Sequence, residues 1–180
     1  SEAAITYSSG YATNLTVIST LMGRGDYVFS DKLNHASIVD GCLMSGAEFR
    51  RFRHNDMAHL EALLRNAPPD IAKLVIADSV FSMDGDIIDL PKMLELCRQY
   101  NAWLMIDEAH SLGVLGEKGT GIEEYFGLGD VIDIKMGTLS KTLATCGGYI
   151  AGNSEIIDAV RSYAPGFIFT TSLPPAICSA

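Results

Sequence analysis

The fold is decided by residues 103–110, Trp103-Leu104-Met105-Ile106-Asp107-Glu108-Ala109-His110. Four apolar residues come first, and two carboxylates and an imidazole follow within four positions. An apolar run of this length is typical of a parallel strand that is covered on both faces. In open α/β sheets, ligands bind beyond the carboxyl ends of the strands. The stretch therefore predicts a buried central strand with Asp107 and His110 at a ligand site.

Short apolar segments alternate with amphipathic ones along the rest of the chain. Strands are expected at 4–7, 26–30, 48–52, 73–77, 103–106, 131–136 and 148–151. Helices are expected at 12–22, 34–44, 57–66, 90–100 and 154–163, with a short helix or turn at 122–126 and Ser154 as the cap of the last helix. This alternation predicts the α/β class, a three-layer structure with a mostly parallel sheet and helices on both faces.

The composition narrows the classes of protein that need to be considered. The chain has 180 residues, of which 48% are hydrophobic and 19% charged, enough for one sizeable core. Its net charge of -9 disfavours nucleic-acid binding, which needs clustered Lys and Arg. No apolar run is long enough for a transmembrane segment. Four widely spaced cysteines predict reduced, mostly buried thiols and a cytoplasmic protein.

The two ends of the sequence suggest a piece of a longer chain. The first residue is Ser1, and a strand pattern begins almost at once. Residues 172–177 have the pattern of a helix start with proline in the first turn, after which the sequence stops. We therefore expect residues 1–180 to be one domain of a larger protein.

Two other kinds of site use residues like those at 107–110. Asp-Glu-Ala-His is also a helicase motif, but a helicase needs an upstream Gly-x-x-x-x-Gly-Lys-Ser/Thr loop that this sequence lacks. A metal site needs three or four convergent ligands, and His35, His54 and His59 show no paired-ligand spacing. Taken alone, His35 is better explained as a capping or surface histidine.

A site for pyridoxal phosphate accounts for more of the polar residues. Such a site needs a lysine for the Schiff base, and Lys141 lies in a small polar loop after a strand. It needs a carboxylate at the ring nitrogen, for which Asp107 is the candidate, and a polar group at the ring oxygen, for which His110 is the candidate. Ser9-Gly10-Tyr11, at the start of a helix, and Thr138 are candidates for holding the phosphate.

Seven motifs in this order resemble those of the α-oxoamine synthases, which are pyridoxal-phosphate enzymes of the aspartate-aminotransferase-like fold (fold type I). The resemblance extends over essentially the whole chain. The motifs are Ser9-Gly10-Tyr11, Asn34-His35-Ala36-Ser37, Phe81-Ser82-Met83-Asp84-Gly85-Asp86, Asp107-Glu108-Ala109-His110-Ser111-Leu112-Gly113, Gly137-Thr138-Leu139-Ser140-Lys141, Gly147-Gly148-Tyr149 and Thr170-Thr171-Ser172-Leu173-Pro174-Pro175.

The resemblance implies roles for the residues that contact the ring. Lys141 is similar to the Schiff-base lysine, Asp107 to the partner of the pyridine nitrogen and His110 to the donor to the ring hydroxyl. His35 resembles the imidazole that stacks on the ring, which replaces its interpretation as a cap. Ser82 corresponds to a second hydroxyl near the ring oxygen.

The resemblance also implies how the phosphate is held and how subunits assemble. Gly10 and Tyr11 match backbone contacts to the phosphate, and Thr138 matches a hydroxyl contact. Thr171 and Ser172 match a stretch that reaches the phosphate of the neighbouring subunit. This implies a homodimer with shared active sites.

The reaction implied is the decarboxylative condensation of an amino acid with an acyl thioester, of coenzyme A or a carrier protein, to an α-amino ketone. Residues 107–111 and 121–127 are most similar to the serine palmitoyltransferase branch, whereas 81–86 are closer to the aminooxononanoate and aminoketobutyrate branches. Family members are about twice as long, which implies that an N-terminal segment and a C-terminal small domain are missing here. Another fold type I activity, transamination or a lyase reaction, and an inactive interaction domain remain open alternatives.

Overall fold

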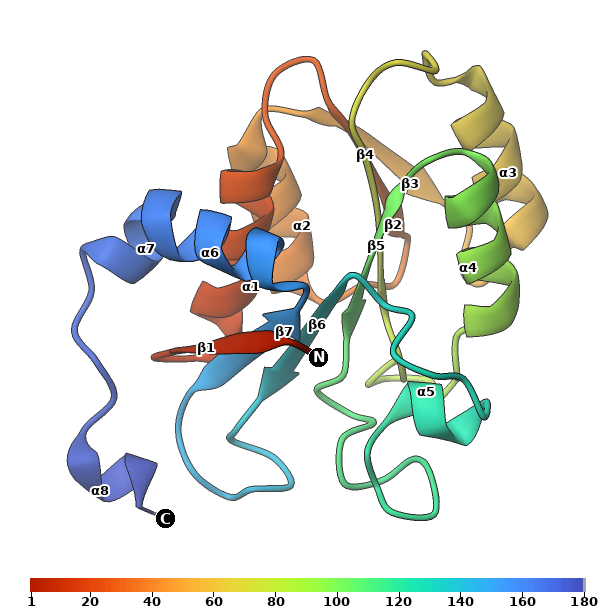
Figure 1. Ribbon diagram of the computed structural model, residues 1–180. Coiled ribbons are helices and arrows are strands. Elements are labelled where there is room, and N and C mark those ends of the chain that lie inside the picture. Colours follow the sequence, from red (N-terminus) through yellow and green to blue (C-terminus); the bar gives the residue numbers. More distant parts are fainter. Residues whose placement is uncertain (180) are drawn as a thin grey trace.

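The computed structural model describes residues 1–179, which form one seven-stranded mixed sheet in the order β1-β7-β6-β5-β4-β2-β3 (Figure 1). Strands β2 to β6 run parallel to one another, and β7 is antiparallel to both β1 and β6. The prediction of a mostly parallel sheet is therefore confirmed. The strands are β1 (Ala3–Tyr7), β2 (Tyr27–Asp31), β3 (Glu48–Phe52), β4 (Lys73–Asp78), β5 (Trp103–Asp107), β6 (Ile134–Thr138) and β7 (Gly148–Gly152).

Helices cover both faces of the sheet, as predicted (Figure 1). One face carries α1 (Gly10–Leu21), α2 (Ala36–Ser45) and α6 (Ser154–Tyr163). The other carries α3 (Met57–Asn66), α4 (Leu90–Gln99) and the short α5 (Ile122–Tyr125). Two further short helices, α7 (Pro165–Ile168) and α8 (Pro175–Cys178), follow α6, and α8 lies apart from the sheet in Figure 1.

Alternate residues of the central strands enter two separate cores, because successive side chains of a strand point to opposite faces. In β4, Leu74 and Ile76 pack under α1 and α2, whereas Val75 and Ala77 pack under α3 and α4. All four side chains are fully buried. The apolar run of β5, which predicted a doubly covered strand, is divided in the same way, with Leu104 and Ile106 in the core under α3 and α4 and Met105 in the core under α1 and α2.

Strand β6 begins three residues later than predicted, at Ile134 instead of residue 131. The backbone N–H groups of Val131 and Ile132 donate to the Glu123 carboxylate, at 2.7 and 2.9 Å. The Asp133 carboxylate accepts a hydrogen bond from the Leu104 N–H at 2.7 Å. Side chains therefore replace the strand ladder in this stretch. The strand also continues through Thr138, two residues beyond its predicted end at residue 136.

Two smaller expectations are corrected by the structure. Helix α6 is capped by Asn153, whose side chain accepts a hydrogen bond from the Glu155 N–H, and not by Ser154. Among the free cysteines, Cys42 and Cys97 are buried but Cys146 and Cys178 are exposed, so the thiols are not mostly buried. Within residues 1–179, no helix is both long enough and apolar enough to cross a membrane.

Candidate active site

The pleat of the sheet places three polar side chains together at one edge. Asp78 ends β4 and lies opposite Asp107 at the end of β5, which in turn lies opposite Met136 of β6. Because side chains alternate, Asp78 and Asp107 follow Ile76 and Met105 onto the face covered by α1 and α2. Thr138 follows Met136 onto the same face. The carboxyl ends of three adjacent strands therefore present polar groups to the start of α1.

Helix α1 begins directly above these strand ends. Ser9 caps it by accepting a hydrogen bond from the Ala12 N–H at 3.1 Å. A β-carbon on Gly10 would lie 3.1 Å from the Met136 methyl and 3.2 Å from Thr138, so only glycine allows this approach without a shift. The free N–H groups and the dipole of a helix N-terminus favour an anionic ligand such as phosphate here.

Helix α2 begins beside α1 and is capped by a histidine. The Nδ1 atom of His35 accepts a hydrogen bond from the Ser37 N–H at 3.2 Å, and the His35 N–H donates to Asp78 at 2.8 Å. The Tyr11 ring meets the imidazole edge-on, with 6.2 Å between centroids. His35 is therefore a cap, as the sequence alone suggested, and also a lining residue of the site.

A cavity of about 230 Å³ lies between these elements and collects all but two of the predicted site residues. Asp107 and Lys141 both line it, as their predicted roles at one ligand require. Its lining consists of Ser9, Gly10, Tyr11, Asn14, His35, Ser37, Asp78, Ser82, Asp107, Ala109, His110, Met136, Thr138, Ser140 and Lys141.

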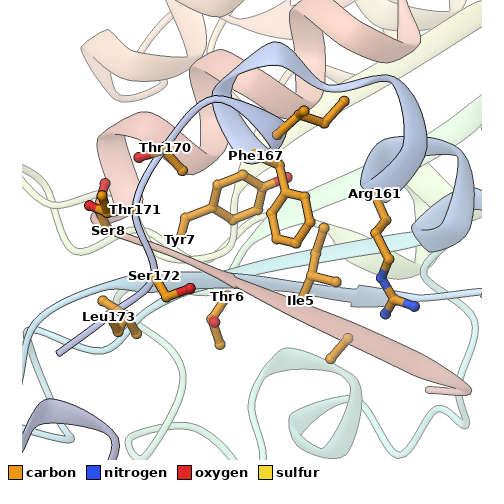
Figure 2. A pocket seen from close by; sticks show the side chains of 12 residues that line it. Ile5, Thr6, Tyr7, Ser8, Arg161, Phe167, Thr170, Thr171, Ser172 and Leu173 are labelled. Atoms are coloured by element: carbon orange, nitrogen blue, oxygen red, sulfur yellow. The ribbon is translucent and has the colours of Figure 1, made fainter. Parts of the chain in front are cut away.

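The two predicted residues that do not line this cavity are Thr171 and Ser172. They line a second cavity of about 510 Å³ along β1 instead, together with Tyr7 and Arg161 (Figure 2). Figure 2 shows the Tyr7 ring beside that of Phe167, with 5.8 Å between centroids. Within a single chain, these two hydroxyls therefore belong to a different surface from Lys141.

Two hydrogen bonds fix the Asp107 side chain in the cavity that Lys141 also lines. Its Oδ2 atom accepts a hydrogen bond from the Asn14 amide at 2.8 Å, and its Oδ1 atom accepts one from the Ala109 N–H at 2.9 Å. Burial raises the pKa of Asp107, and these hydrogen bonds together with the charge of Lys141 act in the opposite direction. A cationic N–H placed against this carboxylate would be strongly favoured.

Asp78 is a second buried carboxylate in the cavity, and sequence reasoning missed it. Burial and the neighbouring Asp107 carboxylate raise the pKa of Asp78. Two adjacent carboxylates cannot both ionise easily, so the pair favours a single negative charge. The available signal was its position, because Asp78 is the first polar residue after an apolar strand, as Asp107 is.

Asn14 is another buried polar residue of the lining that the sequence did not single out. It is buried on α1 and donates to Ser37 as well as to Asp107. A polar residue among the apolar positions of a helix was the only local signal. Which strand end that residue meets depends on the packing of α1 on the sheet.

His110 and Glu108 follow Asp107 but have different surroundings. Partial burial and the charge of Lys141 lower the pKa of His110, so its imidazole is neutral at neutral pH. Glu108 is buried away from the cavity lining, where it accepts hydrogen bonds from the Ser111 hydroxyl and from the Ile122 N–H. Glu108 thus fixes the loop that carries His110.

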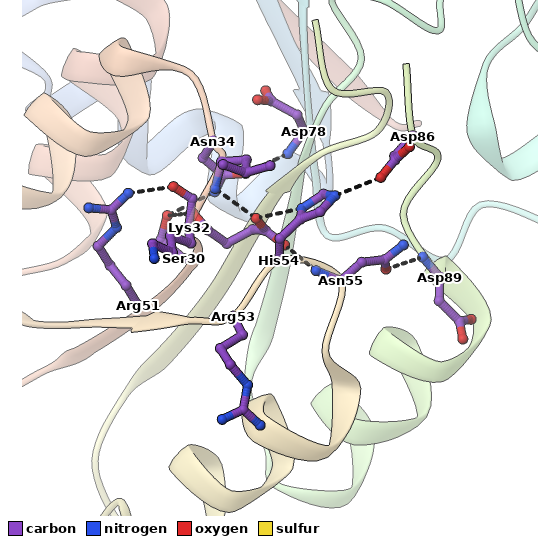
Figure 3. A network of polar contacts seen from close by, with 12 residues as sticks. Ser30, Lys32, Asn34, Arg51, Arg53, His54, Asn55, Asp78, Asp86 and Asp89 are labelled. Atoms are coloured by element: carbon purple, nitrogen blue, oxygen red, sulfur yellow. Dashed lines mark hydrogen bonds and ion pairs between the residues drawn. The ribbon is translucent and has the colours of Figure 1, made fainter. Parts of the chain in front are cut away.

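A second polar network lies next to the cavity and joins the end of β2 to the loops that precede α2 and follow β4 (Figure 3). Asn34 donates to the backbone carbonyl of Ile76 and accepts from the Asp78 N–H, at 2.8 and 2.9 Å, which ties the residue before His35 to the end of β4. His54 contacts Asp31 and Asp86 at 3.0 Å each. These contacts hold the loop that contains Ser82 against β2.

The chemistry available in the cavity is defined by its groups. It offers a primary amine, a buried carboxylate pair, two imidazoles and a helix N-terminus for an anion. Such a set suits an anionic ring compound that reacts with an amine and gains a proton on a ring nitrogen. In the described part of the chain, no group of three or more His, Cys, Asp or Glu residues is arranged to hold a metal ion.

Comparison with known proteins gives the family. Residues 1–180 match the sequence profile of aminotransferase class I and II. The chain therefore belongs to the aminotransferase class I and II family.

Similar proteins within that family are α-oxoamine synthases. An 8-amino-7-oxononanoate synthase of Geobacter sulfurreducens is 52% identical over 179 residues, which are 99% of this chain and 46% of that protein. A 5-aminolevulinate synthase of Bradyrhizobium diazoefficiens is 51% identical over 181 residues, covering 99% of this chain and 44% of that protein. The chain thus spans about half the length of the curated relatives it matches.

A solved structure has the same fold. The serine palmitoyltransferase of S. paucimobilis with a bound PLP–myriocin aldimine superimposes with a TM-score of 0.94 at 44% sequence identity. The superposition covers 97% of this chain and 45% of that one. The seven-stranded sheet and its covering helices are therefore the fold of a pyridoxal-phosphate enzyme of fold type I, as the motifs implied.

Proposed function

We propose that residues 1–180 form the cofactor-binding large domain of an α-oxoamine synthase. The reaction is the decarboxylative condensation of an amino acid with an acyl thioester to an α-amino ketone. The observation that carries the proposal is that Asp107 and Lys141, from different segments of the chain, line one cavity at the carboxyl edge of the sheet. The relatives named above, an 8-amino-7-oxononanoate synthase, a 5-aminolevulinate synthase and a serine palmitoyltransferase, support the reaction class.

The residues of the cavity fit pyridoxal phosphate. The close approach at Gly10 and the capped start of α1 leave room and N–H groups for a phosphate, with the Thr138 hydroxyl beside them. Asp107 would bind the ring nitrogen, and His110 and Ser82 would form hydrogen bonds with the ring hydroxyl. His35 would lie against the ring, and Lys141 would attach it covalently. When bound, this cofactor serves as an electron sink for the substrate carbon.

The protein's own groups would move and hold the protons. The Lys141 amine, which lines the cavity, would take the proton from the substrate carbon and return it. The Asp107 carboxylate would keep the ring nitrogen protonated. The neutral His110 would donate a hydrogen bond without adding a positive charge. Asp107 accepts two hydrogen bonds and the Asp78 side chain accepts one, so Asp78 would hold the proton of the carboxylate pair and the negative charge would lie on Asp107.

The proposed assembly is a cytoplasmic homodimer with shared active sites. Thr171 and Ser172 lie on a surface along β1 that is separate from the cavity of their own chain (Figure 2). Their hydroxyls would therefore be available to the phosphate of the partner subunit. This explanation gives both residues a role that they cannot fill within one chain.

The test is the release of free thiol from an acyl thioester in the presence of pyridoxal phosphate and an amino acid. We expect thiol release that depends on glycine, alanine or serine and is lost in Lys141→Ala. Lys118→Ala, which removes an exposed lysine outside the cavity, should retain activity.

Three other outcomes would contradict the proposal. Exchange of the amino group with a keto acid, without thiol release, would identify an aminotransferase. Cleavage of the amino-acid side chain would identify a lyase. No reaction, with no covalent capture of the cofactor on Lys141 after borohydride reduction and mass spectrometry, would indicate an interaction domain.

A further inference from the structure

The hydrogen bonds around Asn14 form a continuous chain across the cavity wall. The Asn14 Nδ2 atom donates to Asp107 Oδ2 at 2.8 Å and to Ser37 Oγ at 3.0 Å. Ser37 Oγ in turn lies 2.7 Å from His35 Nδ1. We propose that Asn14 is a positioning residue that couples Asp107 to His35 through Ser37 and holds His35 as the tautomer with its proton on Nε2. The catalytic meaning of this coupling rests on the function proposed above.

The direction of each hydrogen bond follows from the groups involved. Asp107 as a carboxylate only accepts, so the Asn14 amide must turn its NH₂ group toward it. The second N–H of that group occupies one lone pair of Ser37 Oγ, and the Ser37 proton is then directed to His35 Nδ1. The same Nδ1 accepts the Ser37 backbone N–H at 3.2 Å. A nitrogen that accepts from two donors carries no proton, so the proton lies on Nε2.

Burial makes this arrangement selective. Asn14 and Ser37 are each 1% exposed, so their hydrogen bond is shielded from bulk water. Among the described residues, the Asn14 Oδ1 atom has no hydrogen-bond partner, although it is buried. Turning the amide over would place Oδ1 against the Asp107 carboxylate and would leave the NH₂ group in the position where Oδ1 now has no partner. The negative charge of Asp107 therefore fixes the amide.

The charged groups nearby act on the two ends of the chain. Lys141 acts on the Asp107 end, and His110 and Tyr11 face the His35 end. Asp78 acts on both ends, because it lies beside Asp107 and accepts a hydrogen bond from the His35 backbone N–H at 2.8 Å. In the part of the chain that the structure describes, none of these side chains forms a hydrogen bond with the Asn14 amide, which gives the only side-chain hydrogen-bond path from Asp107 to the His35 ring. Removing Asn14 should therefore uncouple Asp107 from His35 without altering the other charges.

The consequence for the cavity is that His35 has one ring nitrogen fixed as an acceptor and the other fixed as a hydrogen-bond donor. Nδ1 is occupied by Ser37, so Nε2–H is the group that His35 can offer to a ligand. An N–H donor selects an oxygen acceptor, such as the carboxylate of an amino-acid substrate, and not another donor. The chain thus links the residue proposed to hold the ring nitrogen to a residue proposed to orient the substrate.

The experiment is ¹⁵N NMR of the histidine side chains in the protein without added cofactor. The sequence has only four histidines, and His35→Gln identifies the signals of His35. We expect an unprotonated Nδ1 and a protonated Nε2 in the unmodified protein. In Asn14→Ala the two His35 signals should move part of the way toward each other, because the Ser37 hydroxyl can then reverse and only the Ser37 backbone N–H still favours an unprotonated Nδ1.

Asp107→Asn tests the same coupling from the other end with almost no change in shape. An amide at position 107 cannot accept from both Asn14 and the Ala109 N–H, so the His35 signals should move in the same direction. The double variant, Asn14→Ala with Asp107→Asn, should move the His35 signals no further than either single variant does. Ser45→Ala, on the same helix as Ser37 but with its hydroxyl bonded to the Cys42 carbonyl, should leave them unchanged.

Unchanged His35 signals in Asn14→Ala, or additive movements in the double variant, would overturn the proposal. If Asn14→Ala does not fold, unchanged signals in Asp107→Asn alone would overturn it. Because the measurement uses no cofactor and no substrate, its failure is distinct from a failure of the thiol-release assay.

Discussion

Among the individual residues, His54 makes the contacts whose strength depends most clearly on pH. Its two ring nitrogens contact Asp31, which is fully buried, and Asp86, which is exposed. Partial burial lowers the pKa of His54, but the hydrogen bonds and charges of the two aspartates outweigh burial and raise it overall. The doubly protonated ring is therefore favoured in the folded state.

This predicts a destabilisation of His54→Asn that is larger in acid than in base. A group whose pKa is raised by folding stabilises the folded state fully below its unfolded pKa, about 6.5 for histidine, and this contribution is lost as the pH rises through the folded pKa. We expect a loss of about 1–2 kcal/mol at about pH 5.5 and a smaller loss at about pH 8.5. Urea unfolding at both pH values measures it.

A matched variant separates the two contacts. Asp86→Asn removes the exposed carboxylate and leaves the buried contact to Asp31 intact. It should show a weaker pH dependence than His54→Asn. Equal losses for His54→Asn in acid and base would contradict this account of the network.

How far single residues could be predicted depended on their place in an element. Asp107 and Lys141 were found because each follows a strand-like segment directly, and strand ends are where ligands bind. Asp78 satisfies the same rule, directly after the predicted strand at 73–77, but it was given no role. Asn14 could not be assigned, because its partners, Asp107 and Ser37, are 93 and 23 residues away and the contacts depend on tertiary packing.

At the scale of elements, the close crossing of α1 and α2 sets the geometry of the cavity wall. Gly41 allows this crossing, because a β-carbon there would lie 3.0 Å from the Asn14 carbonyl oxygen and 3.0 Å from Ile18. The two helices carry Asn14 and Ser37, whose side chains meet across the crossing. A larger residue at position 41 would therefore disturb both stability and the site.

We predict that Gly41→Ala destabilises the protein by about 1–2 kcal/mol. Overpacking costs about 1–3 kcal/mol, and the higher helix propensity of alanine recovers up to about 1 kcal/mol. Gly129→Ala, in open space, should change the free energy of unfolding by less than about 0.5 kcal/mol. Denaturant unfolding of both variants is the measurement, and a stabilised Gly41→Ala would show that the helices have room to spare.

The elements themselves were predicted well where hydrophobic periodicity was strong. Strand β3 and helix α3 begin and end at the predicted residues. Errors arose where a distant side chain decides the boundary. The Glu123 carboxylate accepts hydrogen bonds from the backbone N–H groups just before β6. Asn153 caps α6 in place of Ser154, which was expected to be the cap. A local pattern cannot show which side chain competes for a backbone group.

At the scale of the whole molecule, the sheet separates two cores while its carboxyl edge gathers the site. The antiparallel pair β7 and β1 closes one end of the sheet and leaves β1 at the edge, beside Thr171 and Ser172. Both hydroxyls are exposed along this edge. The proposed homodimer would bring that edge to the cavity of the partner subunit.

Shared active sites predict complementation between two inactive variants. In one subunit Lys141 is replaced by alanine, and in the other both Thr171 and Ser172 are replaced. A mixed dimer then has one site with neither change, so an equal mixture should recover about a quarter of the unmodified activity. Activity that stays at the level of the separate variants, while sedimentation shows mixed dimers, would contradict shared sites.

The overall architecture was predictable because alternating strands and helices leave few ways to form a covered parallel sheet. The course of the chain after α6 was less so. The helix α7 has no amphipathic pattern, and residues 165–178 contribute little to either core. Where such a segment lies is decided by what it contacts, and composition carries little information about that.

The most direct test of the central claim is ¹⁵N NMR of pyridoxal phosphate labelled at its ring nitrogen and bound to the protein. If Asp107 binds the nitrogen of the same ring to which Lys141 is covalently attached, the bound ring nitrogen should stay protonated between about pH 6 and 9. In Asp107→Asn it should lose that proton within the same range, while Lys141 still captures the cofactor. An identical ring-nitrogen signal in both proteins would contradict the account.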